Sequence, residues 1–90
     1  MASGKSLQVE VVSHEGRLWH GAASAVQIPT VDGSLGILPG RQPLLAQMGE
    51  GTVTVSCTSE VMSFEVSGGF ASVDSDFITV VADRATVASQ

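Results

Sequence analysis

The sequence predicts an all-β domain, a sandwich of about ten short strands in two packed sheets. Three observations support this prediction. Apolar and polar residues alternate with a period of two, turn-forming residues recur between the alternating runs, and no run of ten or more residues has helical periodicity. Residues 7–85 are expected to form the sandwich, after a flexible start at residues 1–6 and before a short tail at residues 86–90.

The alternating runs define the strands in order along the chain. Successive strand residues point to opposite faces, so each run places one face in a core and the other in water. Strands are expected over residues 7–11, 52–57, 62–66 and 77–82. The last of these is apolar at both sets of positions and is expected to be buried on both faces. Turns are expected at residues 13–16, 31–33, 49–51, 67–69 and 74–76.

The composition agrees with one small domain and limits its function. A chain of 90 residues buries only about 60–65% of the surface that its unfolded form exposes. Hydrophobic residues make up 43% of the chain but aromatic residues only 4%, so the core must consist mainly of aliphatic side chains, which favour strands when β-branched. There is no room for a catalytic domain beside a cofactor domain, so function must come from one face or a few loops.

One segment, residues 29–43, breaks the alternation. It holds all three prolines and a dense set of aliphatic residues, and its only charged residues are Asp32 and Arg41. Proline suits loops and sheet edges because it lacks a backbone donor and fixes φ. A preset apolar surface loses little side-chain entropy on binding, so the segment suits docking to another protein. The same leucines could instead close the end of the sandwich, and the pattern leaves both interpretations open.

Charge and cysteine content exclude several classes of protein. The net charge is −5 and the four basic residues are scattered, whereas nucleic-acid binding requires clustered Lys and Arg. The single cysteine, Cys57, allows no intramolecular disulfide and predicts a reducing compartment. No apolar run reaches the roughly 20 residues that span a bilayer, and Gln8 and Glu10 interrupt any signal-type stretch. We therefore expect contact with a membrane only through a partner.

Two histidines, one cysteine and the methionines raise the possibility of a copper site on a sandwich. Such a site needs two His and one Cys close together with a weak axial Met. Both His14 and His20 precede Cys57 by a long interval, and no histidine follows it. We therefore interpret Cys57 as a small core residue at an inward strand position and predict no metal site.

Other chemistry is equally poorly supported. A lipoyl or biotinyl carrier needs an exposed lysine at a hairpin tip, but the only lysine is Lys5, near the start of the chain. Ser13 and His14 are neighbours on an expected turn rather than a nucleophile and its base. Asp74 and Asp76 flank another turn, where carboxylates are usually solvated. No phosphate-binding glycine loop is present, so the sequence predicts neither catalysis nor a cofactor.

Four motifs resemble those of the epsilon subunits of rotary, F-type ATP synthases. The most specific is DGSLGILPG followed by PLLA, and the others are LQVEVVS with EGRLWHG, GGF followed by a valine, and ITVVAD. They lie at residues 32–46, 7–21, 68–73 and 78–83. The similarity runs from about Leu7 to Ala85, nearly the whole chain.

The resemblance implies a ten-stranded sandwich that serves as a non-catalytic subunit of the central stalk. In this family the domain binds the rotating gamma subunit and rests on the ring of c subunits, so that proton-driven rotation is coupled to ATP synthesis. It implies no cofactor or substrate of its own, and a peripheral place at the cytoplasmic face of the cell membrane. The implied ring-facing loop is Val31, Asp32, Gly33, Ser34 and Leu35. The implied region that faces gamma or closes the sandwich is Leu38, Pro39, Gly40, Arg41, Pro43 and Leu44.

Three departures from the family pattern bear on these implications. Arg41 replaces the usual histidine and Ser34 replaces a common acidic residue, so the resemblance implies no particular ion pair to a neighbour at these positions. Most members continue into a helical hairpin that can inhibit ATP hydrolysis, whereas this chain stops at Gln90. We expect a naturally short form without such inhibition, although a truncated chain would look the same.

A free-standing sandwich that binds a small ligand is the alternative function. It would require a concave apolar pocket with a few convergent polar groups. The sequence supplies the apolar residues but no clustered polar set.

Overall fold

A computed structural model describes residues 6–89 and contains eight β-strands and no helix in that range, so no helix there could cross a membrane. The strands are β1 (Leu7–Ser13), β2 (Gly16–Ala23), β3 (Ala25–Thr30), β4 (Gly33–Ile37), β5 (Leu44–Gln47), β6 (Glu50–Ser56), β7 (Val61–Asp74) and β8 (Phe77–Ser89). The prediction of an all-β fold is confirmed. Residues 1–5 of the expected flexible start, and Gln90 of the expected tail, lie outside the described residues.

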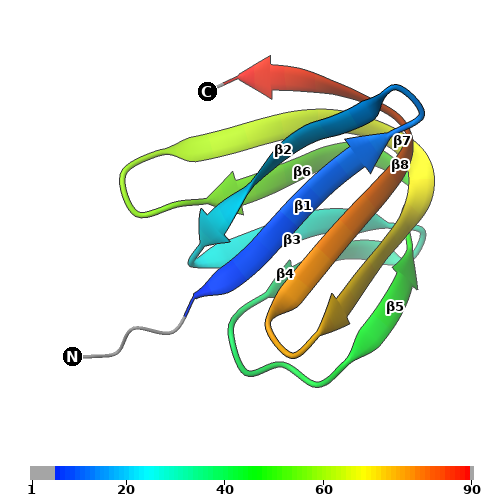
Figure 1. Cartoon of the computed structure of the whole chain (residues 1–90). Coiled ribbons are helices and arrows are strands. Elements are labelled where there is room, and N and C mark those ends of the chain that lie inside the picture. The colour runs from blue at the N-terminus through cyan, green and yellow to red at the C-terminus, as the bar shows by residue number, and fades with distance from the viewer. Residues whose placement is uncertain (1–5, 90) are drawn as a thin grey trace.

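The eight strands build two packed layers because β7 and β8 are long and bend from one layer into the other (Figure 1). The first layer has the order β2-β1-β8-β7-β5, and β1 pairs in parallel with the first half of β8. The second layer has the order β4-β3-β6-β7-β8 and contains the other halves of the two long strands. Each layer therefore has five strand segments, which accounts for the expected count of about ten.

The bend in β7 occurs at two glycines, where the sequence predicted a turn between strands. That prediction is wrong, because the chain passes through residues 67–69 as a continuous strand. Gly68 and Gly69 have φ of 75° and 107°, a backbone conformation that residues with a side chain rarely adopt. A Cβ atom on Gly69 would overlap the carbonyl oxygen of Val81 and lie 2.8 Å from the Cα of Ala82. The glycines thus let β7 cross closely over β8 as both strands change layer.

The core lies between the layers and is entirely hydrophobic within the described residues. Most of its side chains come from the inward positions of the alternating runs, as the sequence predicted. Phe64 is its largest member, and the ring of Trp19 packs against it with centroids 6.4 Å apart. The other fully buried large side chains are Leu7, Val11, Val26, Ile28, Ile37, Met48, Val53, Val55, Ile78 and Val80.

The turns expected at residues 13–16, 31–33 and 74–76 join the hairpins β1–β2, β3–β4 and β7–β8. At residues 49–51 only Gly49 lies outside strands, because β6 already begins at Glu50. The turn between β6 and β7, at residues 57–60, was not predicted, since it contains no glycine or proline.

Two further expectations need correction at the ends of strands. Residues 86–89, expected as a tail, continue β8 and pair with β7 up to Ser63, which lies opposite Ser89. Cys57 does not occupy an inward strand position, because it follows the end of β6; it is half-buried and packs against the edge of the core.

Candidate docking surfaces

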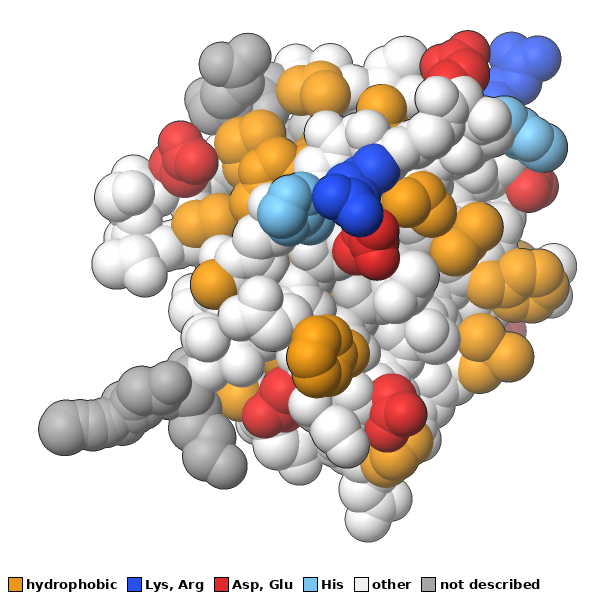
Figure 2. Space-filling model, in the orientation of Figure 1, with side chains coloured by type: hydrophobic (Ala, Val, Ile, Leu, Met, Phe, Trp, Pro, Cys, Tyr) orange, Lys and Arg blue, Asp and Glu red, His pale blue; other side chains and the backbone are white. Residues whose placement is uncertain are grey.

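The outer face of the first layer carries four exposed hydrophobic side chains. Their exposed fractions are 71% for Leu45, 53% for Phe70, 62% for Phe77 and 47% for Val81. Phe70 lies directly opposite Val81 in the pairing of β7 with β8, and Leu45 projects to the same side from β5. We call these four residues the apolar face. Figure 2, which views the molecule from this side, shows the hydrophobic side chains in several groups over the layer.

The apolar face corrects the prediction that the strand at residues 77–82 is buried on both sides. Ile78, Val80 and Ala82 are buried in the core, whereas Phe77 and Val81 project away from it. Apolar residues that gather on one exposed face of a small protein are typical of an interaction surface. The sequence-based prediction did not include Leu45, Phe70 and Val81 among the site residues, because no strand was predicted over Leu45 or Phe70 and Val81 was expected to be buried.

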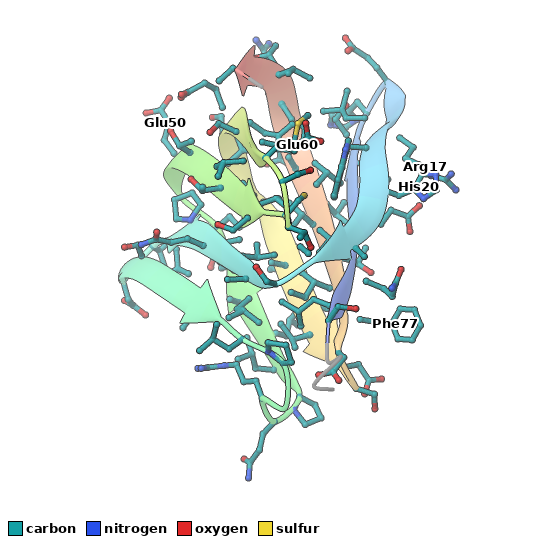
Figure 3. All side chains as sticks on the ribbon, turned by 90° about the vertical axis from the view of Figure 1, so that its left-hand side faces the viewer. Arg17, His20, Glu50, Glu60 and Phe77 are labelled. Carbon is teal, nitrogen blue, oxygen red and sulfur yellow. The ribbon has the colours of Figure 1, made fainter. Side chains whose placement is uncertain are left out.

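A polar group borders the apolar face on the β1–β2 side. Arg17 forms an ion pair with Glu10, with Nε 2.9 Å from Oε2, and His20 lies directly opposite Glu10 on the neighbouring strand. These three side chains and Phe77 line a shallow depression of about 270 Å³. Figure 3 shows Arg17, His20 and Phe77 projecting from one side of the molecule, with Glu50 on the opposite side. Polar rims of this kind commonly surround the apolar centre of protein interfaces.

The implied ring-facing loop forms the tip of the β3–β4 hairpin. Val31, Asp32, Gly33 and Ser34 are exposed, whereas Leu35 is half-buried and packs against the core. The first four are therefore available to a partner, and Leu35 anchors the hairpin to the sandwich.

Hydrogen bonds fix the shape of this tip. The Thr30 hydroxyl accepts from the Asp32 N–H at 3.1 Å and donates to the Gly33 carbonyl oxygen at 2.5 Å. The Val31 N–H donates to the Gln47 carbonyl oxygen at 3.1 Å, which ties the hairpin to β5. The tip is thus held on both sides before any partner binds.

The implied gamma-facing residues lie in the loop between β4 and β5 and at the start of β5. Pro39 and Gly40 form a turn in which Gly40 has φ of 89°, a combination that suits a type II turn. Arg41 and Pro43 are exposed, whereas Leu44 is half-buried and packs against the core. Leu44 therefore helps to close the sandwich, as one interpretation of the sequence held.

The structure brings only part of the implied site together. Residues 31–35 and Leu45 line a common groove of about 510 Å³ beside β5. Leu38 instead borders a groove of about 390 Å³ on the outer face of the second layer, with Gln27 and Gly36. The ring-facing hairpin is thus continuous with the apolar face, whereas Leu38 is turned away from it.

The residues considered for chemistry do not converge. His14 lies in the β1–β2 turn, His20 on β2, and Cys57 beyond the end of β6. Within residues 6–89 there is no group of three His, Cys, Asp or Glu side chains that could hold a metal ion. Burial raises the pKa of the Cys57 thiol above its ordinary value, and the negative charge of Glu60 adds to this shift.

The raised pKa predicts slow alkylation of Cys57. The thiolate is the nucleophile, so at pH 8 the folded chain should react with iodoacetamide more slowly than the chain unfolded in urea. The rate should still be rising at a pH where the unfolded chain has reached its plateau. A pH–rate profile of both forms tests this, and equal midpoints would contradict it.

Comparison with known proteins identifies the family. Residues 6–88 match the family described as ATP synthase, Delta/Epsilon chain, beta-sandwich domain. The ATP synthase epsilon chain of Micrococcus luteus is 48% identical over 80 residues, which cover 88% of each chain. That of Corynebacterium jeikeium is 45% identical over 86 residues, covering 93% of this chain and 70% of the relative.

Solved structures show the same fold. A chain in a structure of the Euglena gracilis mitochondrial ATP synthase, OSCP/F1/c-ring, superimposes with a TM-score of 0.84 at 21% identity, over 91% of this chain and 53% of that one. A chain in the structure of the Tetrahymena thermophila mitochondrial ATP synthase, central stalk/c-ring, superimposes with a TM-score of 0.78 at 17% identity. The match covers 94% of this chain and 69% of that one. With residues 6–88 matched and two relatives above 40% identity, the chain belongs to the family of ATP synthase delta/epsilon chains, through their β-sandwich domain.

Proposed function

We propose that this chain is a non-catalytic subunit of the central stalk of an F-type ATP synthase. In this role it couples proton-driven rotation of the c-ring to the gamma shaft and so to ATP synthesis, while catalysis takes place on other subunits. The observation that carries the proposal is the match of residues 6–88 to the family domain. A free-standing ligand-binding module, the alternative, is not favoured by this membership.

The apolar face and the loop after β4 are the surfaces that we assign to the gamma subunit. From the sequence this assignment comprises Leu38, Pro39, Gly40, Arg41, Pro43 and Leu44. The exposure of Leu45, Phe70 and Val81 extends it onto the outer face of the first layer. Large exposed apolar side chains supply most of the binding energy when a partner buries them in a well-packed centre.

The tip of the β3–β4 hairpin, residues 31–35, is the surface that we assign to the c-ring. Its four exposed residues and the Thr30 hydrogen bonds give it a preset shape. A preset tip loses little conformational entropy on contact, which favours binding. Because this hairpin adjoins the apolar face along the groove beside β5, one rigid body can contact ring and shaft together.

A subunit of this membrane-associated complex lies at the periphery of the membrane. We place it at the cytoplasmic face, in contact with the bilayer only through the other subunits. The single cysteine, which allows no intramolecular disulfide, is compatible with that reducing compartment.

The proposal is tested by co-purification with the gamma subunit and by deletion. The full chain, used as bait with native membranes, should capture the gamma subunit together with ring subunits. Deleting the chain should impair rotor assembly and uncouple ATP synthesis from proton flow. Unchanged assembly and coupled synthesis after deletion would rule out the stalk function.

Ser34→Cys should form a disulfide cross-link to an engineered cysteine in the exposed loop of a c subunit, in a Cys57→Ala background. The matched control is Ser59→Cys, also an exposed serine, in the β6–β7 turn at the opposite end of the second layer. Gel analysis of oxidised membranes should show a product with Ser34→Cys only. An intact complex without that product, or equal products from both variants, would remove the ring assignment.

A further inference from the structure

Asp76 connects three segments that meet at one end of the sandwich. Its side-chain Oδ1 accepts a hydrogen bond from the Gly40 N–H at 2.8 Å. Its backbone carbonyl oxygen accepts from the Gln8 N–H, also at 2.8 Å. One residue of the β7–β8 turn therefore holds both the loop at residues 38–43 and the start of β1. Figure 1 shows this loop and the β7–β8 turn close together at the same end of the molecule.

The backbone of the β7–β8 turn aims the Asp76 carboxylate at the loop. Ser75 and Asp76 have φ of 51° and 69°, so both central residues of this two-residue turn are left-handed, as a type I′ hairpin requires. Asp and Asn tolerate this conformation better than other residues with a side chain. Asp76 thus meets two demands at once, because it adopts the turn conformation and supplies an acceptor atom.

The loop itself has few other constraints of this kind. Within residues 6–89, the bond from Gly40 to Asp76 is the one hydrogen bond between the loop at residues 38–43 and any side chain. Gly40 has φ of 89°, and apart from its chain neighbours no atom lies within 4 Å of the position that a Cβ would take, so no other part of the sandwich packs against it on that side. The position of the Pro39–Gly40 turn relative to the sandwich therefore depends strongly on Asp76.

We propose that Asp76 is a positioning residue that fixes the loop at residues 38–43 in the shape in which it docks to the gamma subunit. The docking role rests on the proposed function, whereas the fixing of the loop does not. A loop ordered before association loses less conformational entropy when it binds. Releasing it should weaken docking even though Asp76 need not touch the partner.

Two variants separate the backbone from the side chain of Asp76. Asp76→Asn keeps the left-handed backbone and retains a side-chain oxygen that accepts from Gly40. Asp76→Gly also permits the left-handed backbone but has no acceptor. In the full chain, hydrogen exchange of the Gly40 amide, followed by NMR, should be about three- to tenfold faster in Asp76→Gly, the factor typical of one lost hydrogen bond. In Asp76→Asn it should stay within about twofold of wild type.

The amide of Val80 serves as the control for global stability, because Val80 is fully buried in the part of β8 that pairs with β1. Its exchange should be unchanged in Asp76→Asn, and any acceleration in Asp76→Gly should be smaller than that at Gly40. Equal acceleration at both amides, or an unchanged Gly40 amide in Asp76→Gly, would overturn the proposal, because the loop would then not depend on the side chain.

Affinity for purified gamma subunit supplies the second readout. Asp76→Gly should weaken binding about three- to tenfold, and Asp76→Asn should restore it, which a general loss of stability would not produce. Faster Gly40 exchange with unchanged affinity would overturn the positioning role. If wild type itself does not bind the gamma subunit, the stalk function fails, while the exchange data still decide whether Asp76 fixes the loop.

Discussion

Replacing Gly69 with alanine should remove most of the stability of the folded domain. A methyl group at this position would overlap the Val81 carbonyl oxygen and approach the Cα of Ala82 to 2.8 Å, so the backbones of β7 and β8 would have to separate. The φ of 107° is itself unfavourable for alanine. Overpacking and backbone strain together should cost on the order of 4 kcal/mol or more. A domain of this size has only about 5–10 kcal/mol of stability to lose.

Urea unfolding, followed by circular dichroism, measures the effect of Gly69→Ala. Gly36→Ala is the matched control, because it makes the same chemical change in β4 where a Cβ would meet no atom within 4 Å. The control should change the free energy of unfolding by less than about 1 kcal/mol. If both variants unfold at the same urea concentration, the close crossing of β7 over β8 does not limit stability.

The double variant Leu45→Glu, Phe70→Glu should abolish binding to the gamma subunit while the fold persists. Both side chains are more than half exposed on the apolar face, so the new carboxylates remain in water in the free chain. In the complex they would be buried without partners. If each side chain contributes about 2 kcal/mol, the dissociation constant should rise by roughly 10³-fold.

The control for the Leu45→Glu, Phe70→Glu variant adds two carboxylates away from the apolar face. Thr58→Glu, Thr86→Glu changes two exposed positions, in the β6–β7 turn and on β8, and also lowers the net charge by two. Isothermal titration with purified gamma subunit should give near wild-type affinity for the control. Full binding by the Leu45, Phe70 variant, or equal loss in both variants, would show that the apolar face is not where the shaft docks.

The sequence was sufficient for the fold class because one face of most strands is buried. The alternation of Leu7, Val9 and Val11 with polar residues survives directly as the inward and outward sides of β1. The pair Gly68–Gly69 was misread because glycine permits both a reversal and a bend, and local sequence does not say which one occurs. The answer depends on β8, whose backbone must pass within contact distance of Gly69.

The candidate site was only partly predictable for a similar reason. Motif resemblance located the β3–β4 hairpin and the loop after β4, but it did not separate Leu44, which packs on the core, from Leu45, which projects outward. Phe77 and Val81 look like core residues in sequence, because hydrophobicity alone cannot distinguish a buried face from a face that a partner covers. The contact of Asp76 with Gly40 joins residues 36 positions apart and leaves no local pattern.

The continuity of β7 and β8 through both layers has a mechanical consequence. In a sandwich whose sheets touch only through side chains, a sideways load on one sheet is opposed by non-covalent contacts and the sheets can slip. Here the two strands β7 and β8, which are hydrogen-bonded to each other along most of their length, run from one sheet into the other. A tangential force applied at Phe70 or Val81 therefore reaches the far sheet along covalent bonds, and the sheets cannot slide past each other without deforming these two strands.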